Sequence, residues 1–169
     1  MTLVELLFCA VIFVLIMGAC MALLFRGWDS WQTSSAQVQL AQEESQSVGW
    51  LTNDIRQSGA SQITNVPADN NGYAQITFSV VQNVLSGGNI TWNAGAINYS
   101  LGGTLGHELI RTQNGQSRVI ANNITSLQFS RQTLTPNMVN IQLAAFAPTY
   151  RGNQQLTSTL TFKVFLRNT

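Results

Sequence analysis

The chain begins with a segment in which hydrophobic residues follow one another almost without a polar position. Residues 6–25 contain no charged side chain. About 20 such residues are enough to cross the hydrocarbon layer of a membrane as a helix. A secretory signal peptide would instead show a basic start, a shorter apolar core and a small-residue cleavage site. The pattern therefore predicts that residues 1–25 form a helix that is apolar on all sides.

After Arg26 the less polar positions recur every three or four residues, which is typical of one face of an amphipathic helix. The positions with this spacing are Val38, Ala41, Ser45, Val48, Thr52, Ile55 and Gly59. No proline occurs before Pro67, so nothing interrupts a helix from about Thr2 to Ser58. We expect Gly59 to be its left-handed cap, and residues 26–59 to be its amphipathic part, continuing into a head.

Beyond residue 73 the period changes to two, which is typical of strands with one buried face. The alternation is visible at residues 76–80, 139–145 and 156–166, and with an irregular step at 124–129. Turn signals separate these segments: Asp69-Asn70-Asn71-Gly72, Ser86-Gly87-Gly88-Asn89, Gly102-Gly103 and Asn114-Gly115. We therefore expect an α+β fold, in which a long N-terminal helix packs on an antiparallel β-sheet head of residues 60–169.

Composition and charge are compatible with two kinds of protein. Charged residues make up 9% of the chain, against roughly 25% in an average soluble domain, while hydrophobic residues make up 45%. A surface of neutral amides and hydroxyls suits close packing against copies of the same chain, although an ordinary secreted protein could show it too. The net charge of +1 predicts no specific nucleic-acid partner. The acids lie mostly before residue 70 and the bases mostly after residue 110, so they form separate solvated surfaces or complementary contacts in a filament.

Both cysteines lie in the apolar segment. Cys9 and Cys20 are eleven residues apart, about 16 Å along a helix, which is too far for a disulfide within the chain. The head contains no cysteine and must be stabilised by its hydrophobic core.

Glu5 is the most unusual residue of the apolar segment. An isolated carboxylate in hydrocarbon costs several kcal/mol, and the cost falls when a cation lies beside it. The first 25 residues contain no lysine or arginine. The remaining cation is the α-amino group, from the same chain or from a neighbouring copy.

The sequence Met1-Thr2-Leu3-Val4-Glu5-Leu6-Leu7, followed by the charge-free run, resembles the mature N-terminus of type IV pilins and type II secretion pseudopilins. The resemblance implies that a prepilin peptidase removes a short basic leader, that Met1 is then N-methylated, and that Glu5 pairs with the N-terminus of an adjacent subunit. Met1, Thr2 and Glu5 would be the processing and assembly residues. The implied packing residues of the filament core are Leu3, Leu6, Leu7, Phe8, Val11, Ile12, Phe13, Leu15 and Ile16.

The resemblance also implies partners and a location. We expect a helical filament made of this chain alone or with other pilins, built by a pilus assembly machinery. Before assembly, the subunit would cross the bacterial inner membrane once. Afterwards it would lie in an extracellular pilus or a periplasmic pseudopilus.

Within the family, residues 53–57, 119–129 and 164–168 are similar to minor pilins of the J and W types. The departures from major pilins are Ala22, where many carry a proline, and the absence of a C-terminal disulfide loop. Major and minor roles, and adhesion, motility, DNA uptake and secretion, all stay open.

The sequence predicts no enzyme, no cofactor and no metal site. His107 is the only histidine, and Glu108 is the only acid after residue 70. Asp69-Asn70-Asn71-Gly72 lacks the glutamate that completes an EF-hand loop. Trp28 and Trp31 follow the apolar segment, where an aromatic belt at a membrane surface is expected. The alternative from another functional class is a single-pass anchored binding or sensor protein, which would have no need of Glu5.

Overall fold

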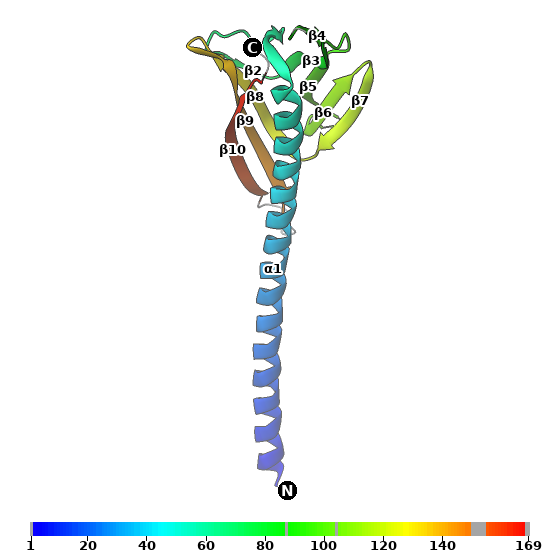
Figure 1. Ribbon diagram of the computed structural model, residues 1–169. Coiled ribbons are helices and arrows are strands. Elements are labelled where there is room, and N and C mark those ends of the chain that lie inside the picture. Colours follow the sequence, from blue (N-terminus) through cyan, green and yellow to red (C-terminus); the bar gives the residue numbers. More distant parts are fainter. Residues whose placement is uncertain (1, 87, 104, 150–154, 168–169) are drawn as a thin grey trace.

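The computed structural model describes residues 2–86, 88–103, 105–149 and 155–167. A single helix, α1 (Leu3–Arg56), extends from a β-rich head and projects far below it (Figure 1). Its 54 residues give a length of about 80 Å at 1.5 Å per residue. The first buried residue along it is Ala36, so more than half of the helix has no cover from the head. The expected α+β class, with one long helix and an antiparallel head, is confirmed.

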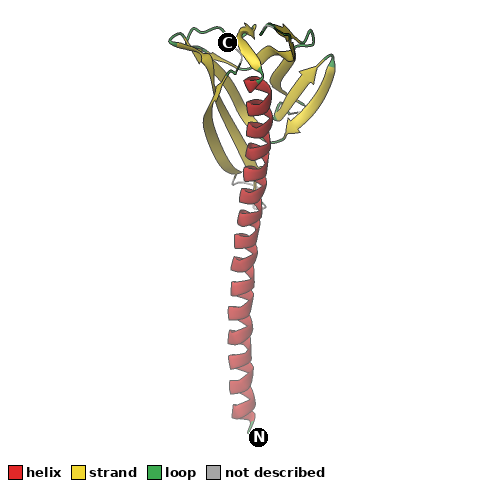
Figure 2. Ribbon diagram, viewed as in Figure 1, coloured by secondary structure: helices red, strands yellow, loops and turns green. Residues whose placement is uncertain are grey.

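The head consists of two antiparallel sheets that lie on either side of the upper part of α1 (Figure 2). Its strands are β1 (Ser58–Ile63), β2 (Gly72–Tyr73), β3 (Ile76–Val84), β4 (Ile90–Trp92), β5 (Ile97–Gly102), β6 (Glu108–Gln113), β7 (Gln116–Ala121), β8 (Ile124–Gln132), β9 (Thr135–Pro148) and β10 (Gln155–Phe165). One sheet has the order β1-β3-β5-β6-β7, with β4 paired to β3, and the other has the order β10-β9-β8-β2. Almost every neighbour in these sheets is close in sequence, so hairpins account for most of the topology.

The four strands with the clearest alternation are where the sequence places them. β3, β8, β9 and β10 cover the predicted segments, and β8 has a register irregularity between Ile124 and Ser126, in agreement with the irregular step. The Asn114-Gly115 turn joins β6 to β7, with positive φ angles of 52° and 76°. Both residue types tolerate that conformation, which two-residue hairpin turns require. The strands β1, β2 and β4 to β7 were not predicted.

The expected packing face of the helix was largely wrong. Of the predicted positions within α1, only Ile55 is buried, while Val38 is 58% exposed. The head instead covers a neighbouring face, whose buried members are Ala36, Leu40, Ser47, Leu51, Asp54 and Ile55. Most of these residues are three, four or seven positions apart, which also places them on one helix face. The periodicity of the sequence is real, but two faces share it.

The expected cap at Gly59 was also wrong. The helix ends at Gln57, whose backbone is right-handed helical and whose N–H donates to the carbonyls of Asp54 and Ile55. Gly59 already belongs to β1 and is buried. The chain therefore passes from helix to strand within two residues, without a left-handed turn.

The core of the head lies between the sheets and the upper part of α1. Its largest fully buried side chains include Tyr99, Phe78 and Phe129, and the rings of Phe78 and Tyr99 stack with centroids 6.3 Å apart. Arg131 is also buried and donates to the carbonyl oxygens of Val66, Ala60 and Pro136 at 2.7 to 3.2 Å. These bonds join three segments of the head, and burial lowers the pKa of Arg131.

Candidate functional site on the long helix

The first turn of the helix forms a capping box around Glu5. The backbone N–H of Thr2 donates to Glu5 Oε2 at 2.8 Å, and the N–H of Glu5 donates to Thr2 Oγ1 at 3.4 Å. Each side chain thus satisfies a backbone donor that the helix start leaves unpaired. The carboxylate of Glu5 consequently has a partner within its own chain. The predicted role of Met1 lies outside the described residues.

The apolar residues that follow cover the helix on all sides. Every predicted packing residue from Leu3 to Ile16 is exposed, between 51% for Val11 and Ile12 and 84% for Leu3. The exposed large hydrophobic side chains continue through Phe25, at 70%. This part of the helix is long and apolar enough to span a membrane. The head contacts none of it, so its cover comes from outside the chain or is absent.

A second apolar surface lies on the upper half of the helix. We call the residues Val38, Ala41, Ser45, Val48 and Thr52 the outer stripe. The first three are exposed and the last two are half-buried. Shallow open grooves run along it, and Gly49 lines one of them and a further groove beside the stripe.

Gly49 has no evident function within the subunit. A side-chain carbon added at this position would meet no atom within 4 Å. A glycine in the middle of a helix costs about 1 kcal/mol relative to alanine. Nothing in the head requires that cost, whereas close approach of another backbone would.

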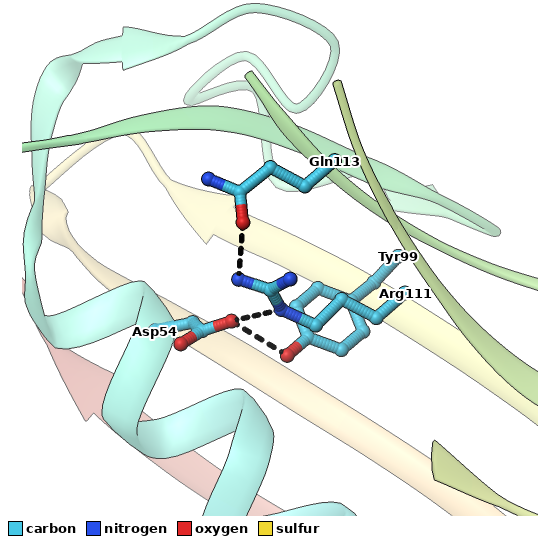
Figure 3. A network of polar contacts seen from close by, with 4 residues as sticks. All are labelled: Asp54, Tyr99, Arg111 and Gln113. Carbon is cyan, nitrogen blue, oxygen red and sulfur yellow. Dashed lines mark hydrogen bonds and ion pairs between the residues drawn. The ribbon is translucent and has the colours of Figure 1, made fainter. Parts of the chain in front are cut away.

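The junction between helix and head contains an ion pair. Asp54 Oδ2 accepts hydrogen bonds from Arg111 Nε at 2.6 Å and from the Tyr99 hydroxyl at 2.9 Å (Figure 3). Arg111 also donates to Gln113 Oε1 at 2.9 Å. The side chains of Asp54 and Arg111 are 9% and 18% exposed. Strands β5 and β6 therefore contact the helix through a largely buried charge network.

This environment shifts two pKa values. Burial raises the pKa of Tyr99 well above its ordinary range, and the charge of Asp54 beside it adds to the effect. Burial alone would lower the pKa of Arg111, but the hydrogen bond and the charge of Asp54 outweigh it and the net shift is upward. Both groups thus keep their binding form at neutral pH: Tyr99 protonated and Arg111 charged.

Two further contacts hold the helix in place. The guanidinium groups of Arg111 and Arg118 lie 5.8 Å and 5.0 Å from the ring centre of Trp50, within the range of cation–π attraction. Lower down, Glu43 Oε2 accepts a 2.8 Å hydrogen bond from the N–H of Asn122. The sequence does not predict this junction, because a pattern of hydrophobic positions cannot indicate an ion pair between residues 57 positions apart.

His107 and Asp69, the head residues considered above for chemistry, make structural contacts in the described part of the head. No group of three or more His, Cys, Asp or Glu side chains that could hold a metal occurs there. His107 packs edge-on against Phe146, with ring centres 5.3 Å apart, and its Nδ1 lies 3.2 Å from the carbonyl oxygen of Ile124. Asp69 accepts hydrogen bonds from Asn71 and from the Tyr73 hydroxyl, within its own turn. These contacts attach the loop before β6 to β8 and β9, and stabilise the turn before β2.

No protein family, no curated protein and no solved structure matches this chain.

Proposed function

We propose that this chain is the structural subunit of a type IV pilus-like filament, inserted in a membrane by its N-terminal helix before assembly. The observation that carries the proposal is Glu5, a carboxylate at the start of a helix whose following 20 residues are apolar and exposed on all sides. An apolar surface of this extent needs either lipid or other protein as its cover. In a membrane anchor alone the carboxylate would serve only as a helix cap, whereas a filament can also pair it with the N-terminus of a neighbouring subunit.

The outer stripe adds support from a separate part of the helix. It extends the apolar surface of residues 3–25 upward along the same helix, over positions that the head leaves uncovered. Its small side chains and Gly49 would let the helix of another copy approach closely. A pseudopilin of a type II secretion system would use the same features. A single-pass anchored sensor accounts for the apolar segment and for Glu5 as a helix cap, but not for the charge of Glu5 or for the outer stripe.

The test replaces Glu5 in cells where this chain is the sole filament subunit. In a lipid-embedded monomer, Glu5→Ala removes only a helix cap, which costs about 1 kcal/mol, so the protein should accumulate in the membrane at its normal level. In a filament, loss of one member of a buried pair costs about 3–5 kcal/mol at every subunit. We therefore expect few or no filaments by electron microscopy. Glu5→Gln, which keeps the shape but not the charge, should be defective too.

Thr2→Ala provides the matched control. It removes the hydroxyl that accepts from the N–H of Glu5 but leaves the carboxylate in place. If the charge of Glu5 is what matters, Thr2→Ala filaments should be far more abundant than Glu5→Ala filaments. Normal filaments from Glu5→Ala protein would refute the proposal and favour the anchored sensor. Equal defects in both variants would show that the charge of Glu5 is not decisive, and would assign the effect to the cap or to processing of the N-terminus.

A further inference from the structure

The base of the head lies close to the end of the apolar helix segment. Trp31 of α1 borders an open groove of about 440 Å³, and Pro148, the last residue of β9, borders it from the head. The remaining lining residues are Gln32, Ser35, Ala36, Gln39 and Thr149. Trp31 and the lower end of β9 are therefore at a similar height along the helix (Figure 1).

This height can be compared with the thickness of a bilayer. The hydrocarbon layer is about 30 Å thick and the headgroup region adds roughly 5–8 Å on each side. If Phe25 marks the end of the hydrocarbon layer, Trp28 and Trp31 lie about 4.5 Å and 9 Å beyond it, at 1.5 Å per residue. Trp28 thus falls within the headgroup region, and Trp31 and Pro148 fall at its outer edge.

The exposed side chains at this level have the chemistry of a lipid interface. Trp28 and Trp31 are 62% and 66% exposed, and their ring centres are 6.1 Å apart, so together they form one aromatic patch. Tryptophan prefers the headgroup level, because its ring is apolar and its N–H is a hydrogen-bond donor. Arg26 stands just after the apolar segment, where its charge can reach phosphate groups. The groove beside them adds the amides of Gln32 and Gln39 and the hydroxyls of Ser35 and Thr149, which can hydrogen-bond to headgroups.

We propose that Trp28, Trp31 and Pro148 form a docking surface that holds the base of the head against the phospholipid headgroup layer in the membrane-inserted subunit. The inference rests on the part of the proposed function that places residues 3–25 in the bilayer. It adds that the head contacts the membrane surface and is not held away from it by the helix. Release of the subunit from the membrane then requires this contact to be broken.

The experiment measures how close each end of β9 lies to the lipid. The full chain, with Cys9→Ala and Cys20→Ala, is reconstituted into phosphatidylcholine vesicles that contain a nitroxide-headgroup lipid as quencher. A single fluorophore is attached at Pro148→Cys or, as the matched control, at Thr135→Cys. Both residues are exposed, and they are the two ends of the same strand, about 44 Å apart at 3.4 Å per residue. We expect at least threefold stronger quenching at position 148 than at position 135.

Trp28→Ala with Trp31→Ala should lower the quenching at position 148 at least twofold while position 135 stays unchanged. Equal quenching at both positions, or quenching at position 148 that does not respond to the tryptophan substitutions, would overturn the docking surface. A fluorophore on native Cys20, with Cys9→Ala and a nitroxide on the acyl chain, reports insertion itself. Quenching at Cys20 without quenching at position 148 refutes only the docking surface, whereas an unquenched Cys20 also removes the membrane part of the proposed function.

Discussion

Replacement of Arg111 by methionine should weaken the contact between the helix and the head. The substitution keeps the length of the side chain but leaves Asp54, 9% exposed, with the Tyr99 hydroxyl as its remaining hydrogen-bond partner among those seen here. Removal of one member of a buried ion pair costs about 3–5 kcal/mol. Because Arg111 retains 18% exposure, the lower end of that range applies. Loss of the contact with Trp50 adds about 0.5–1 kcal/mol. We therefore expect the free energy of unfolding to fall by about 3–4 kcal/mol.

Arg118→Met is the matched control for this prediction. Arg118 contacts the same Trp50 ring, at 5.0 Å, but it is exposed and pairs with no described carboxylate. Its loss should therefore cost no more than about 1 kcal/mol. Denaturant unfolding of the full chain in detergent micelles, followed by tryptophan fluorescence, measures both variants. The double variant Asp54→Leu with Arg111→Met should recover part of the loss, because no buried charge is left unpaired. If Arg111→Met is no more destabilising than Arg118→Met, the ion pair does not hold the junction.

Two further predictions concern the junction and the outer stripe. The pKa of Tyr99 in the folded state is raised above its unfolded value of 10.0, so its contribution to stability should be complete below pH 10 and be lost as the pH rises further. Tyr99→Phe should remove that pH dependence. The prediction is contradicted if the stabilities of wild type and variant change in parallel above pH 10. Gly49→Ala should stabilise the subunit by about 1 kcal/mol, whereas Gly49→Trp should leave it folded but block filament formation. Thr161→Trp, on the exposed face of β10, is the control that should leave filaments intact. Normal filaments from Gly49→Trp protein would show that the outer stripe packs against nothing.

The parts of the fold that follow from sequence are those in which one physical effect dominates. The helix is predictable because residues 6–25 are apolar and no proline interrupts it before Pro67. β3, β9 and β10 are predictable because one of their faces is apolar and the other polar. β6 and β7 are not, because half-buried and polar residues such as Arg111 and Thr112 take part in them. Their pairing depends on the Asn114-Gly115 turn and on contacts with the helix, which a local pattern does not contain.

The error in the helix face has a specific physical cause. A search for apolar periodicity penalises Asp54 and Ser47, although both are buried in the structure. Asp54 is tolerated because Arg111 and Tyr99 bind it, and Ser47 because its hydroxyl donates to the carbonyl oxygen of Glu43. Neither compensation is visible from the sequence. The periodicity instead selects the outer stripe, which has fewer charges.

The outer stripe is a second uncharged helix face that the head does not use. A helix that served only the head would need one apolar face, and the face with Leu40, Leu51 and Ile55 provides it. The chain nevertheless keeps a second face of the helix, from Val38 to Thr52, free of charge. Beside it stands Gly49, which costs stability and where an added side-chain carbon would meet no atom within 4 Å. Because α1 is unbroken from Leu3 to Arg56, this second face is rigidly continuous with the apolar segment below it. In a filament, helices of neighbouring subunits that pack against the apolar segment would therefore also lie beside the outer stripe. One assembly would then bury both surfaces.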